Sequence, residues 1–248
     1  MFPIRDHNPS GRTPYVTYAL ILLNVGIFFG YWLTIPSENE LGWFFVDWGL
    51  VPAEVSRGEK FSGFLTSMFL HGGLMHLGGN MLFLWIYGDN LEDIMGHAKY
   101  LAFYLAAGVV AALAQTLAEP NSLVPMVGAS GAIAGVMGGY LLLFPKARVD
   151  VLIIFVIFFR VFPIPAWILL GLWFGMQVLS GMATPTEMGG VAYWAHIGGF
   201  AAGLVLTIPV FLRLGGFSYW SRTHGEPQHP AAEYTLTKTS IPSIRRRK

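Results

Sequence analysis

The chain has 248 residues, of which 54% are hydrophobic and only 12% are charged. A soluble domain of this size would carry about 25% charged residues, so the composition excludes an ordinary soluble protein and indicates a polytopic membrane protein. The net charge of +1 favours no class of partner, and we expect no nucleic-acid ligand. The absence of cysteine excludes a disulfide framework and a thiolate site.

Taken in chain order, the apolar runs predict six membrane spans, at about 16–34, 66–87, 98–117, 130–144, 164–181 and 192–213. The first run follows Arg5 and Arg12, as the core of a signal peptide would. It is longer than such a core and lacks a small-residue cleavage site before Pro36, so we expect it to be a retained span. The run Val151 to Phe162 is too short to cross and contains Arg160, which predicts an interfacial or re-entrant loop.

Positive charges predict the orientation of these spans. They gather in the N-terminal segment, in the connection after the fourth span and in the C-terminal tail: Arg5, Arg12, Lys146, Arg148, Arg160, Arg213, Arg222, Lys238 and Arg245-Arg246-Arg247-Lys248. Such loops face the cytoplasm, so both termini are expected there, in a multi-pass protein of a bacterial-type inner membrane. Residues 1–14 would form a cytoplasmic N-terminal segment, 15–213 a six-helix membrane domain and 214–248 a disordered basic tail. The first external loop, about 35–61, is amphipathic and carries Trp43 and Trp48 as expected interface anchors.

The fourth span is unusually short and begins with a serine. Ser130 to Phe144 is 15 residues long, about 22 Å of helix against a hydrocarbon core of about 30 Å. If this helix reaches the inner surface, the Ser130 hydroxyl and the first free N–H groups lie within the membrane. Unsatisfied polar groups are not tolerated against lipid, so the start of this helix should line a wet, protein-enclosed cavity.

Three further polar residues enter the membrane from the same outer side as Ser130. His76 and Asn80 lie four residues apart on the second span, with His71 before them, and His196 lies near the start of the sixth. Each alone is more typical of a buried group that ties helices together. Their shared side and similar depth favour a functional site.

Glycines provide a second observation on the same two helices. Gly131, Gly135 and Gly138 form a strip beside Ser130, while Gly199 and Gly203 follow His196 at a spacing of four. Small residues at this spacing allow helix backbones to approach closely in lipid. Close approach of the fourth and sixth spans would bring Ser130 within hydrogen-bond reach of His196.

A serine beside a histidine can act as a nucleophile, and a helix start offers N–H groups to a developing oxyanion. No Asp or Glu lies in the outer half of any span, which predicts a Ser–His dyad and argues against a proton-coupled transporter. Zinc held by His71, His76 and His196 stays open as an alternative, although it leaves Ser130 unexplained. We expect neither a metal nor another cofactor.

Four motifs together resemble the rhomboid family of intramembrane serine proteases over residues 15–213. They are His71-x4-His76-x3-Asn80, Gly88-x3-Glu92-x3-Gly96, Gly128-Ala129-Ser130-Gly131 and Ala195-His196-x2-Gly199-x3-Gly203. The resemblance implies a six-helix bundle with a short central fourth helix. The chain departs from the family pattern at Ala134, where an aromatic residue often lies under the histidine. It also lacks the Trp-Arg pair that some members carry before the second span.

The resemblance also implies roles for residues. Ser130 would be the nucleophile and His196 the general base, while His76, Asn80 and the Ser130 amide would form the oxyanion site. Contacts with the substrate or support for the reacting groups would come from His71, Gly128, Gly131 and Gly199. Substrates would be single-pass membrane proteins cleaved near the outer face. The alternatives are a catalytically inactive rhomboid-like adaptor that binds transmembrane helices, and a channel or metal transporter; the sequence does not indicate an oligomeric state.

Overall fold

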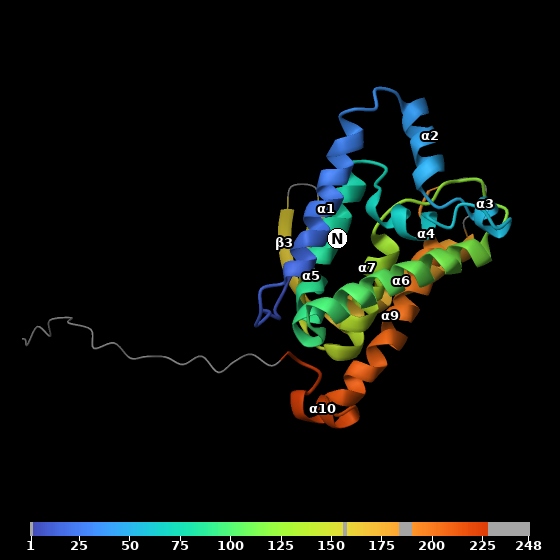
Figure 1. Cartoon of the computed structure of the whole chain (residues 1–248). Coiled ribbons are helices and arrows are strands. Elements are labelled where there is room, and N and C mark those ends of the chain that lie inside the picture. The colour runs from blue at the N-terminus through green and yellow to red at the C-terminus, as the bar shows by residue number, and fades with distance from the viewer. Residues whose placement is uncertain (1, 156–157, 184–189, 228–248) are drawn as a thin grey trace, which may run out of the picture.

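A computed structural model describes residues 2–155, 158–183 and 190–227, and these form a predominantly helical bundle (Figure 1). The long helices are α1 (Tyr15–Trp32), α5 (Leu74–Met95), α6 (His97–Ala118), α7 (Ser130–Leu143), α8 (Ala166–Ala183) and α9 (Tyr193–Arg213). Shorter elements are α2 (Glu38–Trp48), α3 (Pro52–Ser56), α4 (Gly63–Thr66), the 3-10 turn η1 (Ser67–Phe69) and α10 (Phe217–Thr223). Three strands complete the fold: β1 (Phe2–Asp6), β2 (Arg148–Phe155) and β3 (Phe158–Pro165).

Four helices of the described residues are long and apolar enough to cross a membrane, namely α1, α6, α8 and α9. This confirms the multi-pass membrane organisation. α7 is a shorter apolar helix of 14 residues, and α5, which contains His76, Asn80 and Asp89, is not among the four.

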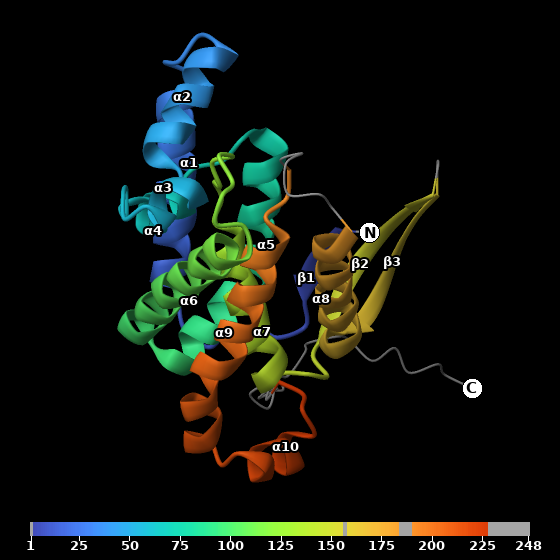
Figure 2. The ribbon, with the colours of Figure 1, turned by 90° about the vertical axis from the view of Figure 1, so that its right-hand side faces the viewer.

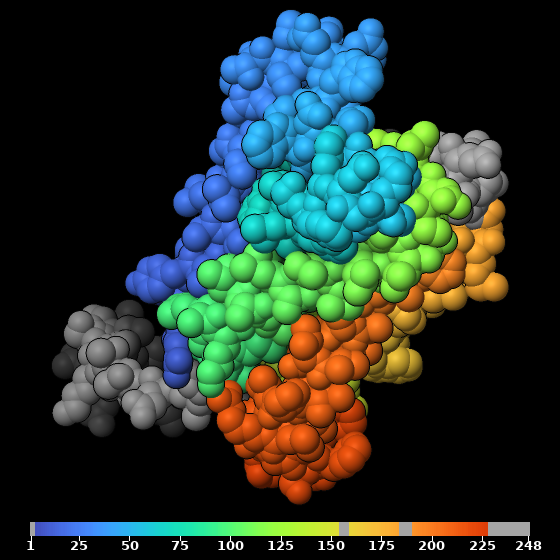
Figure 3. Space-filling model, turned by 45° about the vertical axis from the view of Figure 1, so that its right-hand side comes forward, coloured from blue at the N-terminus to red at the C-terminus, as the bar shows by residue number. Residues whose placement is uncertain are grey.

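The centre of the bundle is α7, which is packed among α5, α6, α8 and α9. Nearly all of its side chains are buried, and many of them are glycine or alanine, so neighbouring helices lie close to its backbone on several sides. In Figure 3 the segment containing α3 and α4, drawn in cyan, covers part of α6, drawn in green. The short helices α3 and α4 therefore cover the side of the bundle formed by α6.

The second predicted span, 66–87, is wrong in its position. The helix begins only at Leu74 and continues to Met95, because Gly72 and Gly73 break the helical conformation between η1 and α5. Glycine is a poor helix former, and Gly73 has an extended backbone. His71 therefore precedes the helix, and His76 lies in its first turn rather than about two turns further in.

The predicted all-α architecture holds for most of the chain, and the structure adds a small antiparallel sheet with the strand order β1-β2-β3. The run Val151 to Phe162, predicted to be an interfacial or re-entrant loop, instead lies in strands β2 and β3, apart from 156–157 outside the described residues. Arg5 and His7 donate to the Asp150 carboxylate at 2.7 and 2.8 Å, which joins the N-terminal segment to β2. Figure 2 shows the hairpin at the margin of the molecule, beyond α8.

The segment 214–248, predicted to be a disordered tail, contains a short helix near its start. Residues 217–223 form α10, which lies below the end of α9 in Figure 1. The Trp220 indole donates to the carbonyl oxygen of Leu142 at 3.0 Å, and this carbonyl lies in the last turn of α7, where helices leave acceptors unpaired. The expectation of disorder for 228–248 falls on residues outside those described.

Candidate functional site

The site is built on the first turns of two neighbouring helices. Ser130 is the first residue of α7, and His196 lies in the first turn of α9. The Ser130 Oγ atom lies 2.8 Å from His196 Nε2, which is hydrogen-bond distance. His196 is buried, with 9% of the residue exposed, whereas Ser130 is half-buried.

Glycine contacts explain why these two side chains meet. A β-carbon at Gly199 would overlap the carbonyl oxygen of Gly131, and one at Gly203 would overlap that of Gly135. The two helix backbones thus touch along the predicted glycine strips. Because the contact begins one turn after His196 and directly after Ser130, it fixes the separation of these two side chains.

A cavity of about 590 Å³ opens beside the pair. Its lining includes Ser130 and His196 together with His76 and Asn80 from α5. The remaining surface is mainly apolar, and it includes Met75, Phe83, Met137 and Trp173. The structure therefore brings all four predicted polar residues to one cavity, as their shared side of the membrane predicted.

His76 and Asn80 are placed to offer hydrogen-bond donors. The Gly72 N–H donates to His76 Nδ1 at 3.3 Å, so the proton of a neutral imidazole lies on Nε2. The Asn80 amide donates to the His76 carbonyl at 3.0 Å, which leaves its second N–H for another acceptor. The N–H of Ser130 lies in the first turn of α7, where helices leave their donors free.

Gly128 has a conformation and a contact that both favour glycine. Its φ of 133° lies in the region that other residues rarely adopt. A β-carbon there would lie 2.8 Å from His76 Nε2. Gly128 thus lets His76 approach the start of α7.

His71 does not line the cavity and lies behind His76, with their ring centroids 5.2 Å apart. It is fully buried, and the Tyr31 hydroxyl bonds both its backbone carbonyl and its N–H, at 2.6 and 2.9 Å. Within the described part of the chain, no group of three or more His, Asp or Glu residues could hold a metal ion. Among these residues, His71, His76 and His196 are not grouped as the zinc alternative requires.

Three residues around His196 were not predicted from the sequence. Gln177 Oε1 lies 2.8 Å from His196 Nδ1, and the ring of Trp173 lies 5.6 Å from the imidazole between centroids. On the other side, the Ala195 N–H donates to Gln115 Oε1 at 3.1 Å. The signal available was a glutamine within each of two apolar spans, since intramembrane polar groups are seldom without a partner.

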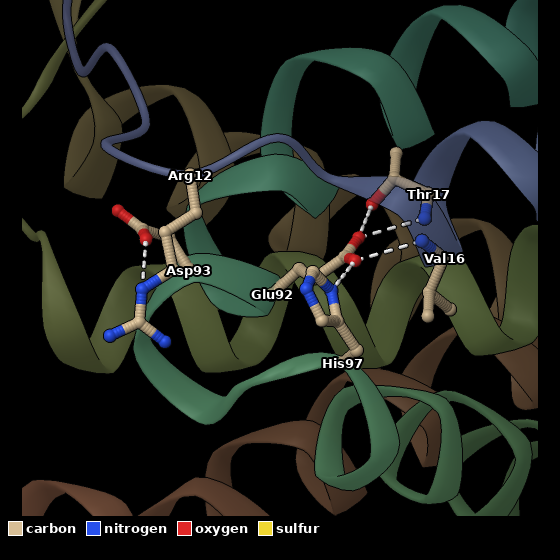
Figure 4. A network of polar contacts seen from close by, with 6 residues as sticks. All are labelled: Arg12, Val16, Thr17, Glu92, Asp93 and His97. Atoms are coloured by element: carbon tan, nitrogen blue, oxygen red, sulfur yellow. Dashed lines mark hydrogen bonds and ion pairs between the residues drawn. The ribbon is translucent and has the colours of Figure 1, made fainter.

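The Gly88-x3-Glu92-x3-Gly96 motif contacts other parts of the bundle (Figure 4). Glu92 is buried and accepts hydrogen bonds from the N–H groups of Val16 and Thr17, both at 2.8 Å, and from the Thr17 hydroxyl at 2.7 Å. It also contacts the His97 ring. These donors lie in the first turn of α1, so Glu92 caps α1 from another helix and joins α1, α5 and α6.

Comparisons with known proteins agree with this architecture. A family model described as the rhomboid domain matches residues 58–213. Mitochondrial rhomboid protein 1 of Saccharomyces cerevisiae is 30% identical over 196 residues, which cover 77% of this chain and 51% of that protein. The rhomboid protease GluP of Bacillus subtilis is 31% identical over 198 residues, covering 79% of this chain and 36% of GluP. A putative rhomboid protease of the same organism, YdcA, is 33% identical over 129 residues, covering 52% of this chain and 61% of YdcA. The chain thus spans about half or less of the first two relatives.

Proposed function

The chain belongs to the rhomboid family, and we propose that it is an intramembrane serine endopeptidase that cleaves membrane-anchored proteins near the outer face of the bilayer. The observation that carries the proposal is the 2.8 Å contact between Ser130 Oγ and His196 Nε2 at the edge of a 590 Å³ cavity. Two of the relatives bear names of rhomboid proteases, which also supports hydrolysis.

The proposed reaction has two stages. The Ser130 oxygen attacks the carbonyl carbon of the scissile peptide while its proton passes to His196 Nε2. The resulting tetrahedral intermediate collapses when His196 returns that proton to the leaving amine, which breaks the C–N bond and leaves an acyl ester on Ser130. A water molecule, deprotonated by His196, then attacks the ester and releases the acid, and His196 returns the proton to Ser130.

The negative charge of each tetrahedral intermediate requires donors that are already in place. The Ser130 N–H, the His76 Nε2–H and the free amide N–H of Asn80 are the proposed donors, all beside one cavity. The positive end of the α7 dipole adds to them. His71 supports His76 from behind in this scheme, and Gly131 and Gly199 hold the two helices together.

The proposed membrane arrangement has six spans and cytoplasmic termini. α5 and α7 join the four helices that are apolar and long enough to cross. Because α7 has only 14 residues, about 21 Å of helix, Ser130 would lie below the outer surface while Leu143 lies at the inner one. Water and substrate would reach the serine through the cavity.

The test uses purified protein and a fluorophosphonate probe, which labels activated serines. Labelling that disappears in Ser130→Ala and in His196→Ala, together with cleavage of a model single-span substrate at a mapped position, is the expected result. Folded wild-type protein that neither reacts nor cleaves would overturn the proposal and favour the inactive adaptor that binds transmembrane helices. Ion or metal conduction that survives Ser130→Ala would instead favour a channel or transporter.

A further inference from the structure

A Ser–His dyad has a specific requirement for its imidazole. The ring must carry its proton on Nδ1, so that the lone pair of Nε2 faces the serine hydroxyl. In a triad, a carboxylate hydrogen-bonded to Nδ1 enforces this tautomer. Here the residue four positions after the serine is Ala134, which has neither a ring nor a polar group to hold the histidine.

The side chain that contacts Nδ1 is Gln177 of α8. Its Oε1 atom lies 2.8 Å from Nδ1, on the opposite side of the ring from the contact with Ser130. An amide oxygen only accepts hydrogen bonds, so this contact requires the proton on Nδ1. The lone pair of Nε2 is then free to accept the Ser130 proton.

The same helix also supports the face of the imidazole. Trp173 lies one helical turn before Gln177, and its ring centroid is 5.6 Å from that of His196 at an interplanar angle of 36°. Trp173 packs in turn on Phe200, at 6.1 Å between ring centroids. Two residues of α8, four positions apart, thus contact the edge and the face of one ring.

We infer that Gln177 is the positioning residue of the base, and that it holds His196 in the reactive tautomer while Trp173 packs on its face. The inference rests on the proposed function, because it gives His196 the role of general base. Gln177 acts through His196, with its contact on the far side of the ring from the serine. Gln115 completes the arrangement from α6, since it accepts from the Ala195 N–H and fixes the backbone next to the base.

The test compares two substitutions that differ in one chemical property. Gln177→Met keeps the length and packing of the side chain but removes the acceptor, whereas Gln177→Glu keeps an acceptor oxygen. We expect Gln177→Met to lower kcat by about 10²-fold with little change in KM, because misplacement of a catalytic group costs that much. Gln177→Glu should retain much more activity. Leu179→Met, at an exposed position on the same helix, is the matched control and should behave like wild type.

Equal activity of wild type and Gln177→Met would overturn the inference. So would equal losses in the Met and Glu variants, since packing alone would then explain them. A second measurement distinguishes this failure from failure of the proposed function. In histidine-labelled protein at alkaline pH, the nitrogen NMR shifts of His196, assigned with His196→Ala, should report the Nδ1–H tautomer in wild type and its loss in Gln177→Met. A wild-type Nε2–H tautomer would contradict the inference even if the protein cleaved nothing.

Discussion

Gly203 of α9 lies so close to Gly135 of α7 that a β-carbon at position 203 would overlap the Gly135 carbonyl oxygen. One turn nearer the site, Gly199 has the same relationship to the Gly131 carbonyl. These contacts leave no room for a methyl group between the two backbones. The separation of Ser130 and His196 is therefore a consequence of glycine packing that begins next to Ser130 and one turn after His196.

Gly203→Ala should push α9 away from α7 and weaken both the fold and the site. The inserted methyl group would meet backbone atoms, which cannot rotate away, so we expect a loss of about 1–3 kcal/mol in the free energy of unfolding. The fluorophosphonate labelling rate of Ser130 should fall in parallel.

Gly175→Ala on α8 is the matched control, because nothing lies within 4 Å of a β-carbon there. Alanine favours helices by up to about 1 kcal/mol over glycine, so this variant should be as stable as wild type or more so. Reversible unfolding in mixed micelles measures both variants. Similar stabilities for the two would show that the glycine contact does not control the packing of α7 on α9.

Substitutions in the cavity should distinguish the proposed base from the proposed oxyanion donors. His196→Ala should abolish cleavage and leave the helical content unchanged, because His196 is the proposed base and the side chain that, among the described residues, is hydrogen-bonded to Ser130 Oγ. Asn80→Ala should lower kcat by about 10²–10³-fold, as expected for the loss of one oxyanion donor. Both are measured with a single-span substrate, alongside circular dichroism. Unchanged rates in the two variants would refute the assigned roles.

Much of the bundle and of the site could be predicted from local signals. The apolar runs gave the ends of five helices to within a few residues, because hydrophobic length is a direct requirement of crossing lipid. The glycine spacing of 131, 135, 199 and 203 correctly indicated which two helices meet, since few other residues permit backbone contact.

The features that were missed depend on partners distant in the chain. Strand β1 forms only because residues 2–6 pair with residues around 150, and neither stretch alone indicates this pairing. The contact of Gln177 with His196 depends on which face α8 turns toward α9, a property of packing rather than of α8 itself. The start of α5 was misplaced because an apolar run continues through Met68 and Leu70, although two glycines break the helix after them.

Glu92→Gln should destabilise the bundle without a direct effect on the site. The carboxylate accepts hydrogen bonds from two N–H groups and a hydroxyl, and it contacts the His97 ring. A glutamine amide has one oxygen and one NH₂ group, so its NH₂ group would face these donors in a buried position. The expected cost is about 1–3 kcal/mol in the free energy of unfolding. Asp93→Asn is the control. The Asp93 carboxylate accepts from the Gly11 N–H at 2.8 Å, which an amide oxygen can also do, and its 3.7 Å contact with the exposed Arg12 is an ion pair of the kind that contributes about 0–1 kcal/mol. Equal costs for the two variants would contradict the capping role of Glu92.

Asp6 of β1 is the carboxyl group that should make stability depend on pH. Burial raises its pKa from 3.8 to about 7, and repulsion by Asp89 adds to the effect, although the hydrogen bond from the Tyr140 hydroxyl at 2.7 Å opposes it. The folded protein therefore holds this proton at pH values where the unfolded chain has released it. Protonation of Asp6 favours the folded state.

The sign of the pH effect follows from linkage. The contribution of Asp6 is fully present below its unfolded pKa of 3.8 and is lost as the pH rises through its folded pKa of about 7. Asp6→Asn should remove this dependence, because an amide accepts from Tyr140 without titrating. The measurement is the difference in unfolding free energy between wild type and Asp6→Asn at several pH values from 4 to 8. Titrating groups that both proteins share, such as Asp150, contribute equally to the two and cancel in this difference. Wild type should lose stability relative to Asp6→Asn as the pH rises. A constant difference would show that Asp6 titrates in the folded protein as it does in the unfolded chain, and a relative gain of wild type would show that folding lowers its pKa; either result contradicts the prediction.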